Sequence, residues 1–105
     1  MLLQPFKTIG IGVTFSPNLK ANVYEASRLS LMFQSKLVLI HVGEESLEKE
    51  DEFKTILDPF IKQGLRFEIV FKPGNPVDVI LSISEEKQID LIILGALKRE
   101  NFLKY

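Results

Sequence analysis

Four short apolar runs alternate with three longer amphipathic segments along the chain. The runs cover Phe6–Val13, Lys36–Val42, Arg66–Phe71 and Asp90–Leu94. The first, second and fourth runs are apolar almost throughout, as is typical of parallel strands covered on both faces. In the third run, Arg66 and Glu68 alternate with apolar residues, so we expect this strand at an edge of the sheet. Two glycines in the first run, Gly10 and Gly12, indicate close approach by a neighbouring element.

Two of the amphipathic segments begin with a capping residue followed by proline. Apolar residues recur at helical spacing over Pro17–Gln34, and Ser16 is expected as the N-cap of this helix, with Pro17 as its first residue. The later segment starts with Asn75 as cap and Pro76 as first helical residue, and it continues to about Lys87.

The middle segment, Ser46–Gln63, predicts a third helix. Its acidic beginning complements the helix dipole, and Gly64 is expected as a C-cap. Pro59 lies inside the pattern, so we expect either a kink or a division into two short helices. Strands that alternate with helices in this way imply right-handed crossovers. The predicted fold class is therefore α/β, a three-layer doubly wound parallel sheet.

The composition excludes several classes of function but does not identify one. The 105 residues fit one domain, and a net charge of −1 provides no basic surface for nucleic acid or for an anionic membrane. The chain has no cysteine, which excludes disulfides and thiolate metal sites. The start, Met1–Phe6, does not read as a secretory signal, and no apolar run approaches the ~18–20 residues of a membrane span. We therefore expect a cytoplasmic protein without direct membrane insertion.

The chain contains three blocks of sequence, KTIGIGVTFSPN, SKLVLIHVGEE and GNPVDVILSISEEKQIDLIILGA. Together these blocks resemble the universal stress protein domain. The resemblance runs from about Lys7 to Gly95. It implies an adenine nucleotide alpha hydrolase-like sheet of order 3-2-1-4-5. Here the fifth strand is absent, so we expect order 3-2-1-4 in a single domain over residues 1–105, truncated at its C-terminus. The fourth strand would then be an apolar edge that pairs with another chain or is capped by Ala96–Tyr105. The expected partner is a second copy or a larger parent protein.

The resemblance also implies where a nucleotide would bind. Members of the family that bind ATP hold it at the carboxyl ends of the strands, near the point where strand order reverses. The residues that this implies here are Val13, Thr14, Val42, Gly95 and Lys98. Thr14 replaces the usual acidic residue, and Lys98 stands where a second glycine is usual. The chain ends before the family's G-[ST] pair. We therefore expect no cofactor, with ATP as the alternative.

Catalytic groups are sparse in this sequence. His41 is the only histidine, so it has no second imidazole for a metal site. Its ring is expected either to be satisfied by neighbours near a strand end or to form a wall of an adenine pocket beside Val42. Lys98 and Arg99 either supply charge to a phosphate or belong to a solvated loop. No phosphate-binding P-loop or dinucleotide fingerprint occurs.

These patterns support two main hypotheses about function. The first is a non-catalytic regulatory or interaction domain of the stress response, and the second is an adenine-nucleotide binder with or without slow hydrolysis. An enzyme of a related nucleotide-binding fold is a third possibility, for which the sequence offers no nucleophile, base or metal cluster.

Overall fold

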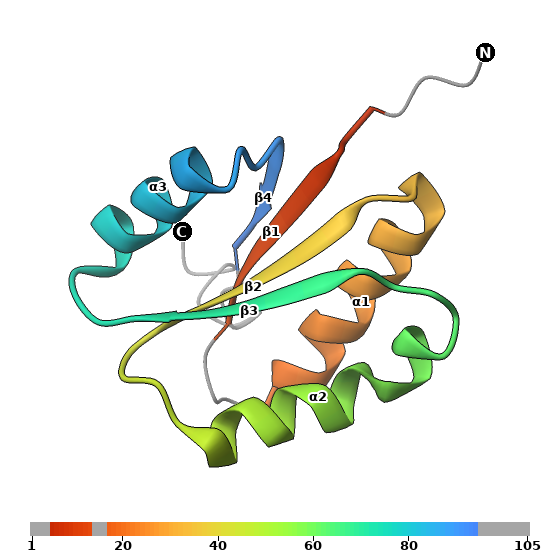
Figure 1. Ribbon diagram of the computed structural model, residues 1–105, viewed down its shortest axis with the longest axis horizontal. Helices are drawn as coiled ribbons and strands as arrows, with labels where there is room; N and C mark the ends of the chain where they lie inside the picture. Colours follow the sequence, from red (N-terminus) through yellow and green to blue (C-terminus); the bar gives the residue numbers. More distant parts are fainter. Residues whose placement is uncertain (1–4, 14–16, 95–105) are drawn as a thin grey trace, which may run out of the picture.

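The computed structural model describes residues 5–13 and 17–94. Along the chain these form β1 (Thr8–Val13), α1 (Leu19–Phe33), β2 (Lys36–Val42), α2 (Leu47–Ile61), β3 (Phe67–Lys72), α3 (Pro76–Glu86) and β4 (Leu91–Ile93). All strand pairs are parallel, and the sheet order is β3-β2-β1-β4 (Figure 1). The expected class, strand order and edge position of β3 are confirmed.

The sheet is covered on both faces, as the apolar runs predicted. Helices α1 and α2 lie side by side on one face, and α3 lies on the other (Figure 1). The larger core, on the α1/α2 face, joins Ile9, Ile11, Leu37 and Leu39 of the sheet to Phe53 and Leu57 of α2. The smaller core, beneath α3, contains Val38, Ile40, Val79 and Ile83. The fold is therefore the expected three-layer arrangement.

The two glycines of β1 face the α3 side of the sheet. A Cβ placed on Gly10 would lie 2.7 Å from Cδ1 of Ile89, closer than a real Cβ approaches another atom. A Cβ on Gly12 would meet its nearest neighbour, Cδ1 of Ile80, at 3.4 Å, which is ordinary contact. The expectation of close approach is confirmed at Gly10, where the side chain of Ile89, which follows α3, lies against the strand.

The start of α1 differs from the sequence prediction. The helix begins at Leu19, with Asn18 at the N-cap, so Pro17 is not its first residue. The carbonyl of Asn18 accepts the first helical hydrogen bond, from Asn22 N at 2.9 Å, and this bond fixes the beginning of the helix. The expected cap, Ser16, lies outside the described residues.

Helix α2 is a single element that contains Pro59, so the division into two helices is wrong. Pro59 lies close to the end of the helix at Ile61, and its missing N–H removes only one hydrogen bond of the last turns. Gly64 then adopts a φ of +94°, and Leu65 N donates to Phe60 O at 3.0 Å. These are features of the Schellman motif, and they confirm Gly64 as the capping glycine.

Strand β4 is joined to the start of β1 by one carboxylate. Oδ2 of Asp90 accepts hydrogen bonds from Lys7 N at 2.8 Å and from Thr8 N at 3.0 Å. In return, Asp90 N donates to Thr8 O at 2.9 Å. Because β4 is only three residues long, these bonds extend its pairing with β1 at the amino end.

Candidate functional site

The carboxyl ends of the strands form the edge at which the sequence predicts a nucleotide. In the order β3-β2-β1-β4, the chain moves outward in one direction from β1 through β2 to β3 and then returns to the other side of β1. The strand order therefore reverses at β1, and open α/β sheets bind ligands at this type of position. Val13 ends β1, and it pairs with His41, the residue before Val42 at the end of β2. The fold thus brings Val13 and Val42 to neighbouring positions on this edge.

The other three predicted site residues, Thr14, Gly95 and Lys98, lie outside the described residues. Their part in a site therefore stays a prediction. Val13 itself is buried, and Val42 is partly buried against the smaller core. Of the predicted site residues that the structure describes, Val42 is thus the one with a partly exposed side chain.

His41 links the ends of β1 and β2. Its Nδ1 lies 3.1 Å from the carbonyl oxygen of Val13, and because a carbonyl only accepts, Nδ1 carries the proton. The ring packs edge-on against Phe53 and Phe71, with ring centroids 6.1 and 5.6 Å away. The side chain is only 8% exposed. The expectation of a ring satisfied by its neighbours near a strand end is confirmed.

Helix α3 begins at the same edge, directly after β3, and its first amides are already hydrogen-bonded. Oδ1 of Asn75 accepts from Val77 N at 3.0 Å and from Asp78 N at 3.2 Å. The carboxylate of Asp78 in the first turn adds negative charge near the positive end of the helix dipole. The chain therefore partly neutralises the end of α3 that would otherwise attract a phosphate.

Acidic side chains also follow β2 at this edge. Glu44 and Glu45 come directly after Gly43, and Glu48 and Glu50 lie in the first turn of α2. They stabilise the positive end of α2, but they also oppose a highly charged anion nearby. Among residues 5–13 and 17–94, no group of three or more histidine, cysteine or acidic residues is placed to hold a metal ion. In the same ranges, no helix is long and apolar enough to cross a membrane.

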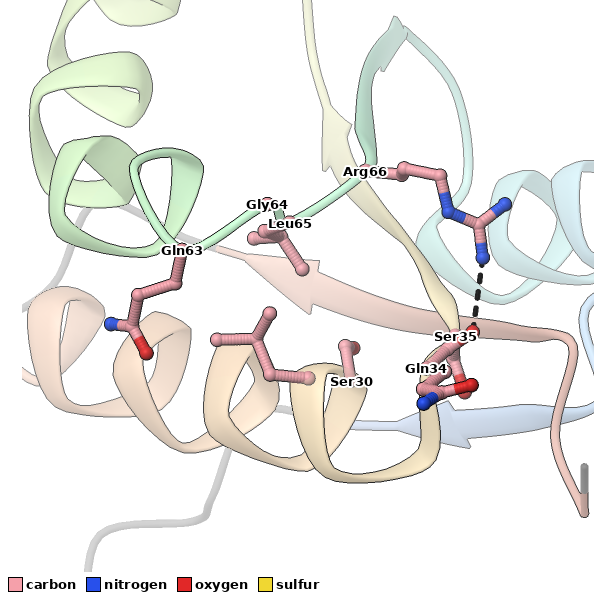
Figure 2. Close-up of a pocket in the computed structure, with 8 residues that line it drawn as sticks. Ser30, Gln34, Ser35, Gln63, Gly64, Leu65 and Arg66 are labelled. Atoms are coloured by element: carbon pink, nitrogen blue, oxygen red, sulfur yellow. Dashed lines mark hydrogen bonds between the residues drawn. The ribbon is translucent and has the colours of Figure 1, made fainter.

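A concave region lies at the opposite, amino end of the sheet. This cavity of about 290 Å³ lies between the end of α1 and the turn after α2 (Figure 2). It is lined by Ser30, Leu31, Gln34, Ser35, Gln63, Gly64, Leu65 and Arg66. A guanidinium N–H of Arg66 donates to the carbonyl of Gln34 at 3.0 Å and joins its two sides. No sequence pattern predicted this cavity, because it forms where helix ends that are distant in the chain meet.

Serine hydroxyls of α1 lie buried near this cavity. Ser30 rises from α1 toward the space below Leu65 (Figure 2). Within the part of the chain that the structure describes, the Oγ atoms of Ser27 and Ser30 have no hydrogen-bond partner. The cavity lies at the other end of the strands from Val13 and Val42, so it is not part of the predicted nucleotide site.

The strand order and the helices on both faces place this chain in the class of doubly wound α/β domains. No protein-family model and no curated protein matches the sequence. Solved structures do match. A universal stress protein in complex with cAMP has a TM-score of 0.72 at 18% identity, and the match covers 96% of this chain and 84% of that one.

Two further structures extend the comparison. A universal stress protein from Archaeoglobus fulgidus DSM 4304 gives a TM-score of 0.70 at 20% identity, covering 86% of this chain and 33% of that chain. Protein Rv1636 from Mycobacterium tuberculosis H37Rv gives 0.64 at 21% identity, covering 91% of this chain and 75% of the other. This chain therefore has the fold of the universal stress proteins.

Proposed function

We propose that this chain is a non-catalytic regulatory domain of the universal stress type, which acts in a stress response by associating with a second copy or with a larger protein. The observation that carries the proposal is the fold, which it shares with the universal stress proteins at TM-scores up to 0.72. Among the strands that the structure describes, β4 lies at an edge of the sheet, and this position supports the association because an edge strand can pair with another chain. Cytoplasmic localisation remains part of the proposal.

The state of His41 supports a non-catalytic role. A general base must reach a substrate proton, and this imidazole is buried, with Nδ1 directed at the Val13 carbonyl and its ring between two phenylalanines. It is the only histidine of the chain, and there is no cysteine nucleophile. The described contacts of His41 are thus those of a side chain that joins two strands.

A second candidate function, adenine-nucleotide binding, is favoured by a specific comparison. One structure with the same fold is a universal stress protein in complex with cAMP. In this chain the ligand would lie at the carboxyl edge near Val13, Thr14 and Val42, with Gly95 and Lys98 on its phosphate side. The acidic residues after β2 favour a ligand with little negative charge, so we expect cAMP or AMP to bind more tightly than ATP.

Calorimetric titration of the full chain with cAMP, AMP and magnesium-ATP tests both candidates. A regulatory domain that acts through association alone shows no heat of binding with any of the three. Micromolar binding that is lost in Val42→Asp supports the nucleotide candidate instead. The control is Leu47→Asp, at the exposed start of α2, in which we expect this binding to be kept. Release of phosphate from ATP at a rate that depends on the protein contradicts the non-catalytic proposal.

Sedimentation at two protein concentrations tests the association. We expect a dimer whose fraction rises with concentration. A monomer at every concentration, with β4 amides that exchange rapidly with solvent, rules out association between copies of this chain.

A further inference from the structure

The cavity at the amino end of the sheet combines one charged side chain with polar and apolar ones. Among the described residues that line it, Arg66 is the charged one, and Leu31 and Leu65 provide apolar surface. No carboxylate of the described residues lines this cavity, so the charge at its wall is positive. A concave site with an apolar wall and a few convergent polar groups is typical of small-molecule binding.

Ser30 does not make the hydrogen bond that other helical hydroxyls of this chain make. The Oγ of Ser84 in α3 donates to Ile80 O at 2.7 Å. The Oγ1 of Thr55 in α2 likewise donates to Asp51 O at 2.9 Å. Both bonds reach the carbonyl one turn earlier, which is the usual partner of a hydroxyl inside a helix. Within residues 5–13 and 17–94, the Oγ of Ser30 has no such partner, although the residue is 0% exposed.

The side chain of Ser30 points from α1 toward the space below Leu65 (Figure 2). A buried hydroxyl without a partner destabilises the folded protein unless another group binds it. Serine has a single side-chain torsion, so its Oγ can adjust to a molecule in this space. Ser27 is equally buried and also lacks a partner in the described part of the chain, but it does not line the cavity. Ser30 is therefore the unpartnered hydroxyl that a ligand here would meet.

The guanidinium of Arg66 is held on the other side of the cavity. One of its N–H groups donates to the carbonyl of Gln34 at 3.0 Å. A guanidinium has five N–H groups, so this bond leaves donors that match a carboxylate. Gln34, at the end of α1, follows Ser30 by four residues, which corresponds to about 6 Å along a helix axis. The charged donors and the Ser30 hydroxyl are thus roughly one helical turn apart.

We propose that this cavity binds a short hydroxy acid, with its carboxylate on Arg66, its hydroxyl on Ser30 and its carbon chain against Leu31 and Leu65. A carboxylate matches the cation, and a hydroxyl can both donate to and accept from the serine. A separation of about one helical turn between the two groups suits a chain of a few carbon atoms. At about 290 Å³, the cavity is at the small end of the range for ligand sites, which also favours a small acid. The inference does not depend on the proposed function, because the cavity and the predicted nucleotide site lie at opposite ends of the sheet.

Amide NMR titration of the full chain with 3-hydroxybutyrate, at constant ionic strength, tests this proposal. The probe carries a carboxylate, a hydroxyl and a methyl group for the apolar wall. We expect the amide signals of Ser30, Gly64 and Leu65 to shift and to saturate with millimolar affinity. Butyrate, which lacks the hydroxyl, and 3-hydroxybutyramide, which lacks the charge, should both bind several-fold more weakly.

Three variants test the two contacts separately. Arg66→Gln weakens binding of the probe about tenfold, because a hydrogen bond between charged groups is lost. Ser30→Ala weakens it about threefold, and it also removes the preference for 3-hydroxybutyrate over butyrate. The matched control is Ser27→Ala, which removes an equally buried hydroxyl from the same helix and leaves the affinity unchanged.

Three results overturn the proposal. If the signals of Ser30, Gly64 and Leu65 do not move at tens of millimolar probe, the cavity does not bind a hydroxy acid. If butyrate binds as tightly as 3-hydroxybutyrate, the hydroxyl of the ligand has no partner there. If the probe binds equally well to Arg66→Gln and to the natural protein, its carboxylate does not lie on Arg66.

Discussion

At Gly10 the segment after α3 lies so close to the sheet that a Cβ has no room. The space that a Cβ would need is taken by the δ-methyl of Ile89, with Cδ1 of Ile92 at 3.0 Å as well. The sequence indicated a close approach at the two glycines, but it did not distinguish them. Only the packing of Ile89 in three dimensions separates Gly10 from Gly12.

Gly10→Ala is expected to lower the free energy of unfolding by about 1–3 kcal/mol, because Ile89 and Ile92 must both shift to admit a methyl group. The matched control is Gly12→Ala, where the nearest atom lies 3.4 Å from the added methyl. We expect this variant to change stability by less than ~1 kcal/mol. Urea unfolding measures both variants. Equal losses would mean that crowding at Ile89 is not the cause.

For His41, the sequence predicted the kind of environment but not the hydrogen-bond partner. Its position in an apolar strand predicted a ring satisfied by neighbours. The partner, Val13 O, could not be predicted, because it depends on the register in which β1 pairs with β2. Register is set by packing across the whole sheet rather than by residues near the histidine.

The three helices within residues 5–13 and 17–94 end in the same way, although only one does so with glycine. Gln34, Gly64 and Gln88 have φ values of 55°, 94° and 53°, and the residue after each donates its N–H back to the last turn of the helix. Gly64 was predicted as a cap because glycine adopts this conformation at low cost. The two glutamines carried no such signal, because the left-handed conformation is imposed on them by the turn into the next strand.

Gln34→Gly is expected to be more stable than Gln34→Ala by about 0.5–1 kcal/mol. Both variants lose the same side chain, but alanine keeps the Cβ that strains a left-handed residue. The greater freedom of glycine in the unfolded chain offsets part of this gain. Thermal unfolding of the two proteins measures the difference. Equal stability would show that Gln34 is not strained.

Across the whole molecule, one carboxylate connects two strands and the end of a helix. The Oε1 of Glu68 on β3 lies 2.9 Å from Lys36 Nζ on β2, and its Oε2 lies 2.7 Å from Lys87 Nζ after α3. Hydrogen bonds from both lysines lower the pKa of Glu68 below its usual value, and the bond from Lys87 has the larger effect. The same bond to Glu68 raises the pKa of Lys87.

Because the pKa of Glu68 is lowered, we expect the effect of Glu68→Gln on the stability of the folded protein to depend on pH. The ionised carboxylate stabilises the folded protein above the usual glutamate pKa of 4.5, and this contribution is lost as the pH falls through the lowered folded value. We therefore expect the variant to be less stable than the natural protein at pH 7, with a smaller difference at pH 3. Urea unfolding at both values checks this. Glu25→Gln, which disrupts an exposed pair with Arg28, is the control and should change little. A difference independent of pH contradicts the role of the charge.

The fold was predictable because apolar runs and caps act locally, and the crossover rule then leaves few arrangements. The candidate site could be predicted only as an edge of the sheet. Val13 and Val42 reach that edge because they end neighbouring strands, which strand order alone implies. The cavity beside Arg66 depends on which side chains meet across the molecule, and no sequence pattern marks it.

The hydrogen bonds of Asp90 have a consequence for how the protein is made. Its partners, Lys7 and Thr8, precede it by 83 and 82 residues. During synthesis, β1 to β3 and their helices have left the ribosome before Asp90 arrives, so β1 spends this interval as an outer strand with unpaired amides. Slow translation of the segment around α3 prolongs that interval, and the nascent chain is then most open to mispairing along β1.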